Sequence, residues 1–195
     1  MVSPLGSCLR RSTAFGVGLS LGSVASAAGT PYATLKSLDA ELRAADSATA
    51  VLQSLCARNH LADPPRIRAE QDRIASAAIT TRQRRRLAIG PDEPVVYRRV
   101  KLLCGDHLLS QAENWYVPSR LTPDMNAALT TTDMPFGTAI RPLAPSRRHL
   151  STQWLWRGRG VAPAQLLRHR ALVLDGAGRP LAEVVETYQR DTIAP

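Results

Sequence analysis

The sequence predicts an α+β protein built on a single antiparallel sheet, and two observations carry this prediction. Within residues 34–65, apolar side chains recur every three or four positions, which is the spacing of amphipathic helices. Residues 95–118 and 166–189 each resemble two strands joined by a short turn, "CGDH" in the first and "DGAGR" in the second. Helices that come first and hairpins that follow favour helices packed on one sheet.

Turn and cap residues set the expected boundaries of these elements. Asp46-Ser47 predicts an N-cap that divides the first helical region into two helices, and Pro64-Pro65 ends that region. Residues 66–79 are expected to be extended. A short capped helix is expected within 119–137, starting at Ser119 or Thr122.

Length and charge restrict the classes of function. The chain has 195 residues and a net charge of +9, and arginine accounts for most of its basic residues. A chain of this length fits one domain with a substantial core. The densest basic run, "TRQRRRL" at 81–87, contains no aromatic residue on which a base could stack. We therefore interpret it as a solvated surface and expect no nucleic-acid partner.

Residues 1–27 resemble an export signal. Two arginines precede a weakly apolar stretch from 13 to 24, and Ala25-Ser26-Ala27 matches the cleavage rule for signal peptides. This pattern predicts a periplasmic or secreted domain at 28–195, with no stable membrane span once the leader is removed. The alternative is a disordered leader on a cytoplasmic protein.

The cysteines leave open whether the chain has a disulfide, and the histidines argue against a metal site. Loss of the leader removes Cys8 and leaves Cys56 and Cys104, which either form a disulfide in an oxidising compartment or are two small buried apolar side chains. The four histidines are scattered without the spacing of metal ligands, so no metal site is expected.

Two consecutive arginines stand in the apolar segment that begins at residue 95. Neighbouring residues of a strand face opposite sides of the sheet, so Arg98 and Arg99 cannot both face solvent. A desolvated guanidinium is costly unless an anion meets it. The sequence therefore predicts one inward arginine that awaits an acid.

The order of four motifs resembles the chorismate lyase family and its fold superfamily. The motifs are "DSATAVLQ", "YRRVKLLCGDHLL" continuing to "YVP", then "MPFG", then "GRPLAEVVE", and the resemblance runs from about Tyr32 to the C-terminus. It implies a single antiparallel sheet backed by helices, with helical flaps over an enclosed ligand cavity. It also implies elimination of pyruvate from chorismate to give 4-hydroxybenzoate, without a cofactor.

Matching the motifs residue by residue assigns one end of the implied site. Arg99 matches the arginine that binds the ring carboxylate, through the planar fork of its guanidinium. Phe136 falls where a backbone N–H meets the same carboxylate. Ala48 falls at the start of the flap helix, where N-terminal amides favour an anion.

The other end of the implied site is acidic. Glu186 matches the glutamate that meets the 4-hydroxyl group and serves as the proton partner, but counting from "GRP" requires one extra residue in the strand. Glu183 is the competing candidate, on the opposite face of an unbroken strand. Asn114 replaces an arginine of the family pattern, and Arg170, with Arg168, is expected to supply the missing charge to a second carboxylate.

Two functions follow from these assignments. The first is a chorismate lyase in which Arg99 and Glu186 act on the substrate. The alternative is an exported, non-catalytic binder of a small aromatic or other organic acid on the same fold. Either protein is expected to be a monomer whose partner is a small anionic acid.

Overall fold

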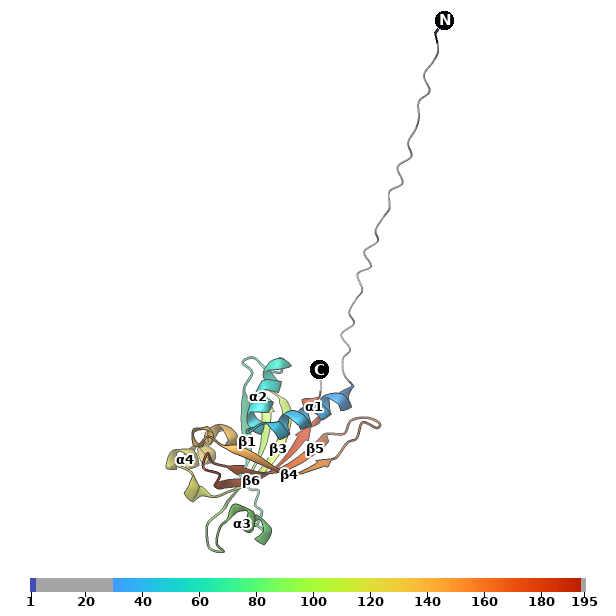
Figure 1. Cartoon of the computed structure of the whole chain (residues 1–195). Coiled ribbons are helices and arrows are strands. Elements are labelled where there is room, and N and C mark those ends of the chain that lie inside the picture. Colours follow the sequence, from blue (N-terminus) through green and yellow to red (C-terminus); the bar gives the residue numbers. More distant parts are fainter. Residues whose placement is uncertain (3–29, 194–195) are drawn as a thin grey trace.

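The computed structural model describes residues 1–2 and 30–193, and its centre is one six-stranded sheet (Figure 1). The strands follow the order β1-β2-β3-β6-β5-β4, and every neighbouring pair is antiparallel. Their bounds are β1 Ile67–Asp72, β2 Val96–Cys104, β3 His107–Tyr116, β4 Ser146–Trp154, β5 Gln165–Leu174 and β6 Pro180–Gln189. The predicted α+β class with a single antiparallel sheet is confirmed. The predicted leader lies outside the described residues, apart from its first two.

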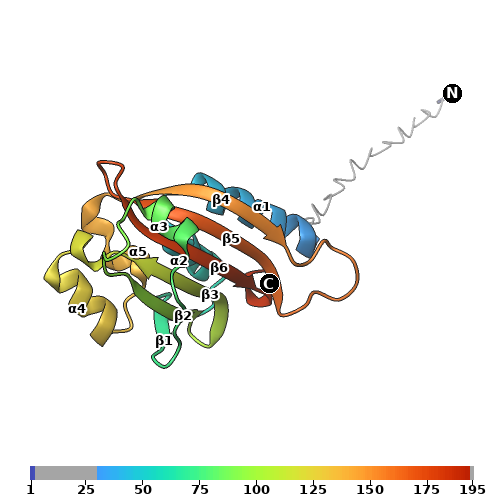
Figure 2. The ribbon, with the colours of Figure 1, turned by 90° about the horizontal axis from the view of Figure 1, so that it is seen from below.

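Helices cover the two faces of the sheet unequally (Figures 1 and 2). The helices α1, α2, α4 and α5 lie on one face, whereas α3 crosses the other. Their bounds are α1 Pro31–Ala44, α2 Ala48–Arg58, α3 Thr81–Leu87, α4 Pro123–Thr131 and α5 Phe136–Ala139. The described residues also form three single 3-10 turns, at Pro118–Arg120, Arg141–Leu143 and Arg190–Thr192.

Polar caps start the helices where the sequence predicts them. The Ser47 hydroxyl accepts a hydrogen bond from the backbone N–H of Ala50, which makes Ser47 the N-cap of α2. Thr122 caps α4 in the same way, which settles the choice between Thr122 and Ser119. The first helical region ends at Arg58, before the two prolines.

Two elements, α3 and β4, have no clear signature of regular structure in the sequence. The basic run at 81–87 forms α3, which begins with a capping box in which the side chain of Thr80 accepts from the N–H of Gln83 and Gln83 accepts from the N–H of Thr80. Strand β4 lies at the edge of the sheet, and its residues are only half-buried. Its burial pattern lacks the clean alternation that identifies a strand from sequence.

The main core lies between the sheet and the helices α1 and α2. It includes Leu35, Leu52 and Leu109, none of which is exposed. Within this core Cys56 of α2 and Cys104 of β2 form a disulfide, with their Cα atoms 5.9 Å apart. Of the two alternatives for these cysteines, the structure selects the disulfide.

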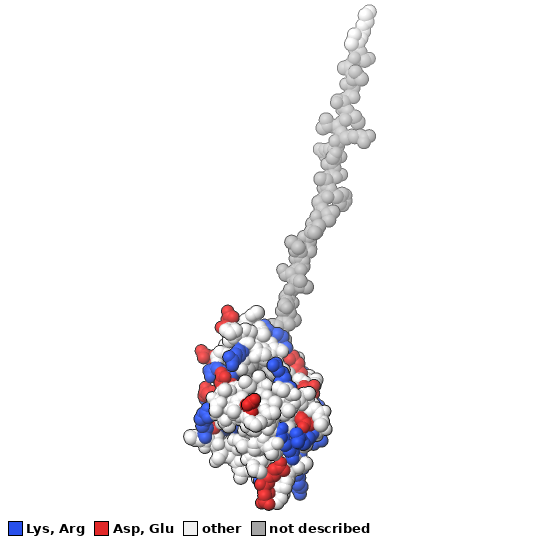
Figure 3. All heavy atoms as spheres, turned by 90° about the vertical axis from the view of Figure 1, so that its left-hand side faces the viewer, with Lys and Arg blue, Asp and Glu red and all other residues white. Residues whose placement is uncertain are grey.

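The surface at the α4 end of the molecule carries basic and acidic side chains around a largely uncharged centre (Figure 3). This face presents charges of both signs rather than a continuous basic stripe. Among the described residues, no helix has both the length and the apolar character needed to cross a bilayer.

Candidate functional site

The inward arginine predicted on β2 is Arg98. Its residue is 2% exposed, whereas the side chain of Arg99 is about half exposed and lies 3.9 Å from Asp72 on the other face of the sheet. Arg98 shares its face with Cys104, six residues on, because strand residues an even number apart point the same way. The disulfide to α2 fixes that face as the helix-covered one. The prediction of one inward arginine is confirmed, but its assignment to Arg99 is wrong.

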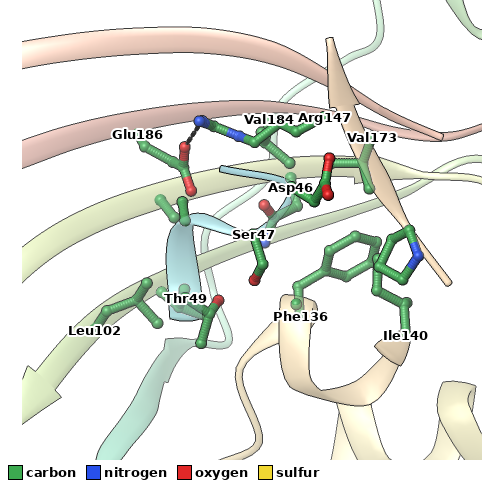
Figure 4. A pocket seen from close by; sticks show the side chains of 16 residues that line it. Asp46, Ser47, Thr49, Leu102, Phe136, Ile140, Arg147, Val173, Val184 and Glu186 are labelled. Atoms are coloured by element: carbon green, nitrogen blue, oxygen red, sulfur yellow. Dashed lines mark hydrogen bonds and ion pairs between the residues drawn. The ribbon is translucent and has the colours of Figure 1, made fainter. Parts of the chain in front are cut away.

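A hollow of about 500 Å³, including the part that opens to solvent, lies between this face of the sheet and the helices α2 and α5 (Figure 4). Its walls are mostly apolar, and its charged side chains are Asp46, Arg147 and Glu186. The lining residues are Asp46, Ser47, Ala48, Thr49, Val100, Leu102, Ala112, Asn114, Phe136, Gly137, Ile140, Pro145, Arg147, Val173, Val184 and Glu186.

The starts of α2 and α5 meet at this hollow. A Cβ atom on Gly137 would lie 2.8 Å from the Thr49 hydroxyl and 3.0 Å from the Ser47 hydroxyl, so only glycine permits this approach. First-turn amides have no carbonyl partner within their own helix. Two helix starts therefore bring the backbone N–H groups of Ala48, Thr49, Phe136 and Gly137 to one wall, where they can donate to a ligand.

A buried ion pair closes one end of the hollow. The side chain of Arg147 on β4 is 4% exposed, and its Nη2 donates to Oε2 of Glu186 on β6. The Tyr188 hydroxyl donates to the same oxygen at 3.0 Å, and Nη1 of Arg147 donates to the carbonyl of Leu42 at 3.1 Å. Oε1 of Glu186 makes none of these bonds and remains an acceptor beside the hollow.

Burial and charge decide the protonation of this end. Burial is the largest single influence on Arg147 and lowers its pKa, but Glu186 and Tyr188 together outweigh burial and hold the pKa of Arg147 above its usual value. Burial raises the pKa of Tyr188, so this hydroxyl keeps its proton and acts as a donor. Beneath it, His169 is fully buried with Nε2 2.7 Å from Oδ1 of Asp39, and burial lowers the pKa of His169.

Arg98 is not itself a lining residue of the hollow, but its neighbours are. Its cross-strand partner on β3 is Asn114, which lines the hollow. Nη2 of Arg98 donates to the carbonyl of Met134, two residues before Phe136, at 3.0 Å. Nε and Nη1 are buried without a partner, and no carboxylate in the described part of the chain pairs with Arg98. Burial lowers the pKa of Arg98, as expected for a desolvated cation without a counter-ion.

Glu186 and Glu183 lie on opposite faces of β6, as strand alternation requires. Glu186 faces the hollow, whereas Glu183 lies beneath α3 with no exposed surface. The extra residue that the placement of Glu186 requires is present, because the pairing of β6 with β5 passes from Pro180 directly to Ala182.

Two further expectations are wrong because their residues face away from the hollow. Glu183 is not an acid of the cavity, since its carboxylate binds Arg86 and Arg170 on the α3 side. Arg170, together with Arg168 two residues before it, cannot reach a ligand in the hollow. Strand alternation puts both arginines on the face opposite His169 and the main core.

The structure thus brings together four of the predicted residues and adds one that was missed. Ala48, Phe136, Asn114 and Glu186 all line the hollow. Arg147 was missed, although the same reasoning that singled out the first arginine pair applies to it. It is followed by Arg148, and on β4 one of these two arginines is buried and the other exposed.

The composition of the hollow suits an organic ligand rather than a metal ion. Its acidic side chains are only two, and one of them is occupied by an arginine. Over the residues that the structure describes, no group of three or more histidine, cysteine, aspartate or glutamate side chains gathers at metal-binding distances.

No known family profile matches the sequence. An alignment of 179 residues, covering 83% of this chain, is 37% identical to the uncharacterized protein y4mC of Sinorhizobium fredii strain NGR234, of which it covers 76%. The chain belongs to the y4mC family.

Solved structures share the fold of this y4mC family member. The effector domain of PhnF from Mycobacterium smegmatis superposes with a TM-score of 0.52 over 74% of this chain and 88% of that domain, at 10% identity. The whole PhnF protein gives the same TM-score over 76% of this chain, but the match spans only 65% of its length, less than two thirds. The predicted α+β, chorismate lyase-like fold class is confirmed, and the PhnF effector domain shares this fold.

In this y4mC family member, loss of one partner of the Arg147–Glu186 pair should destabilise the fold more than replacement of both partners. Glu186→Gln leaves a buried guanidinium without its counter-ion and should lower the free energy of unfolding by about 3 kcal/mol. Replacing both partners, with Arg147→Met and Glu186→Leu, should cost less than about 1 kcal/mol, because no unpaired charge remains. Urea unfolding at pH 7 measures both values.

The exposed neighbour of this pair supplies the control. Arg148→Met removes the same charge from the outer face of β4 and should change the free energy of unfolding by less than about 0.5 kcal/mol. Equal stability of wild type and Glu186→Gln would show that the pair does not hold the end of the hollow.

Proposed function

We propose that this domain binds a small organic acid in the hollow between the sheet and the helices α2 and α5. The observation that carries the proposal is Arg98, a buried guanidinium with two unused donors and no carboxylate partner in the described chain. Such a charge costs several kcal/mol unless an anion meets it. A ligand carboxylate that reaches Arg98 supplies the missing counter-ion.

The surroundings of Arg98 support a carboxylate at this end. The backbone N–H groups of Phe136 and Gly137 start α5 at the hollow, two and three residues after the carbonyl that Arg98 binds. A planar carboxylate has two oxygens, which can accept from the guanidinium and from these amides together. Asn114, beside Arg98 on the sheet, is a further neutral donor.

The far end of the hollow supports a ligand that donates hydrogen bonds there. Oε1 of Glu186 is a free acceptor, and the Asp46 carboxylate also lines the hollow. Between the two ends, Val100, Leu102 and Ala112 form an apolar sheet surface on which a ring can lie. The ligand class that fits is an aromatic or similar flat acid with a hydroxyl or amino group opposite its carboxylate.

Binding of 4-hydroxybenzoate, measured by titration calorimetry, tests this proposal. Arg98→Gln should weaken binding by about tenfold or more, because it removes charge-assisted hydrogen bonds from a dry site. Arg99→Gln is the matched control: it removes the same charge from the adjacent residue on the other face and should change the affinity by less than about twofold.

The thermal stability of the Arg98→Gln variant shows whether weaker binding results from a folding defect. Arg98→Gln removes an uncompensated buried charge, so the thermal midpoint of the unliganded variant should equal or exceed that of wild type. If Arg98→Gln stays folded and binds 4-hydroxybenzoate as tightly as wild type, Arg98 does not anchor the ligand.

Chorismate lyase activity is the second candidate function. The shared fold supports it, as does the presence of Glu186, Phe136 and Ala48 in one hollow. Chorismate carries two carboxylates, however, and the second needs a cation of its own. Arg147 is committed to Glu186, Asn114 stands where the family pattern has an arginine, and Asp46 repels a further negative charge. These residues favour binding without turnover.

Incubation of the purified protein with chorismate separates the two functions. We expect no 4-hydroxybenzoate above the uncatalysed rate, measured by absorbance, together with saturable binding of 4-hydroxybenzoate in the same preparation. Product formation that Glu186→Gln abolishes would instead assign the lyase reaction.

We further propose that the mature domain acts outside the cytoplasm. The disulfide between Cys56 and Cys104 supports this location, because structural disulfides persist in oxidising compartments. The signal-like residues 1–27 support it independently. Mass spectrometry of the exported protein should find a chain that begins at residue 28, with both cysteines resistant to alkylation. Recovery of the uncleaved chain with free thiols in the cytoplasm would exclude export.

A further inference from the structure

A second hollow lies on the opposite face of the sheet, beside α3 (Figure 2 shows α3 on this face). It measures about 860 Å³, including its open side. None of its residues belongs to the hollow of the function proposed above. Its basic helix is the run at 81–87, for which the sequence predicts a solvated surface. The lining residues are Ala78, Thr80, Arg82, Gln83, Arg86, Trp115 and Arg170.

Two of its arginines share one buried carboxylate. Nη1 of Arg86 lies 3.1 and 3.0 Å from the two oxygens of Glu183, and Nη1 of Arg170 lies 2.5 Å from Oε1. Glu183 has no exposed surface, whereas about a third of each guanidinium-bearing side chain remains exposed. One carboxylate between two guanidinium groups leaves one positive charge in excess, carried by nitrogens that face the hollow.

A third arginine adds to this excess. Arg82 is exposed on α3 four residues before Arg86, so the two side chains are neighbours on one face of the helix. Like charges at this spacing destabilise a helix. No ion pair of Arg82 occurs within residues 30–193, and the lining contains no aspartate or glutamate. The hollow therefore holds two positive charges that the protein does not neutralise.

Most of the remaining polar groups of the lining are already engaged. The Thr80 hydroxyl and Oε1 of Gln83 are hydrogen-bonded in the capping box of α3, and the indole N–H of Trp115 donates to the carbonyl of Ala77 at 3.3 Å. The three guanidinium groups are thus the charged donors of the lining, and the side-chain amide of Gln83 is a further neutral donor.

We infer that this hollow is a second ligand site, which binds a small dianionic oxyanion of the phosphate class. Two unneutralised guanidinium charges match a dianion, and a phosphate group offers more acceptor oxygens than a single carboxylate, so that donors from α3 and from β5 can bind it together. The sheet separates this site from the hollow beside α2 and α5. The inference therefore does not depend on the function proposed above.

Calorimetric titration of the full chain with inorganic phosphate, at constant ionic strength, tests the inference. We expect saturable binding that Arg82→Gln weakens by about tenfold. Arg82 is the residue to change, because it makes no ion pair in the described chain and its loss leaves Glu183 neutralised. Arg85→Gln on the same helix is the matched control. It removes an equal charge from an exposed position outside the hollow and should weaken binding by less than about twofold.

Nuclear magnetic resonance locates the bound anion. Phosphate should shift the indole N–H signal of Trp115 and leave the amide signals of Phe136 and Gly137 in place. A second titration with phenyl phosphate distinguishes the two sources of the group: tighter binding assigns an organic ester, and equal or weaker binding assigns the free anion.

Three results would overturn the inference. The first is the absence of saturable binding. The second is equal weakening of phosphate binding by Arg82→Gln and Arg85→Gln, because this would indicate diffuse attraction to a basic surface. The third is a set of phosphate-induced signal shifts at Phe136 rather than at Trp115.

Discussion

The organisation of this protein depends on a buried guanidinium group that has no counter-ion among the residues that the structure describes. Arg98 is as buried as the leucines around it, its one hydrogen bond goes to a backbone carbonyl, and two of its donors are unused. A fold selected for stability alone would place an apolar side chain there or supply a carboxylate. The cost is tolerable because the sheet, the disulfide and the helices of the main core hold the surrounding residues in place.

The two ends of the hollow beside α2 and α5 differ in how a buried arginine charge is treated. At the far end, the charge of Arg147 is neutralised within the protein by Glu186, and Tyr188 donates to the same carboxylate oxygen. At the near end, Arg98 keeps its charge unneutralised. Under the proposed function, a site with one paired and one unpaired cation favours a ligand with a single negative charge at a defined end. That asymmetry separates this hollow from one built to hold a dianion.

Strand alternation gives the sheet two chemically different faces. In each arginine pair, at 98–99 and 147–148, one member is buried and the other exposed, and the two glutamates of β6 divide in the same way. On the helix-covered face, charges are few and each has a defined place. The α3 face has more arginines than acids around its hollow, so its electrostatic potential is positive.

The sequence alone determined the α+β class, the hairpins, the cap at Ser47 and the presence of one inward arginine, because these follow from local periodicity, turn chemistry and alternation. It also identified four lining residues of the hollow through the order of motifs. Which arginine points inward was decided only by the tertiary structure, since alternation relates residues to one another but does not say which face the helices cover. The pairing of Cys104 with α2 supplies that missing fact and places Arg98, at an even spacing, on the covered face. Arg147 escaped prediction for a related reason: its edge strand is half-buried, and its partner Glu186 lies 39 residues away in the sequence, beyond the reach of any local pattern.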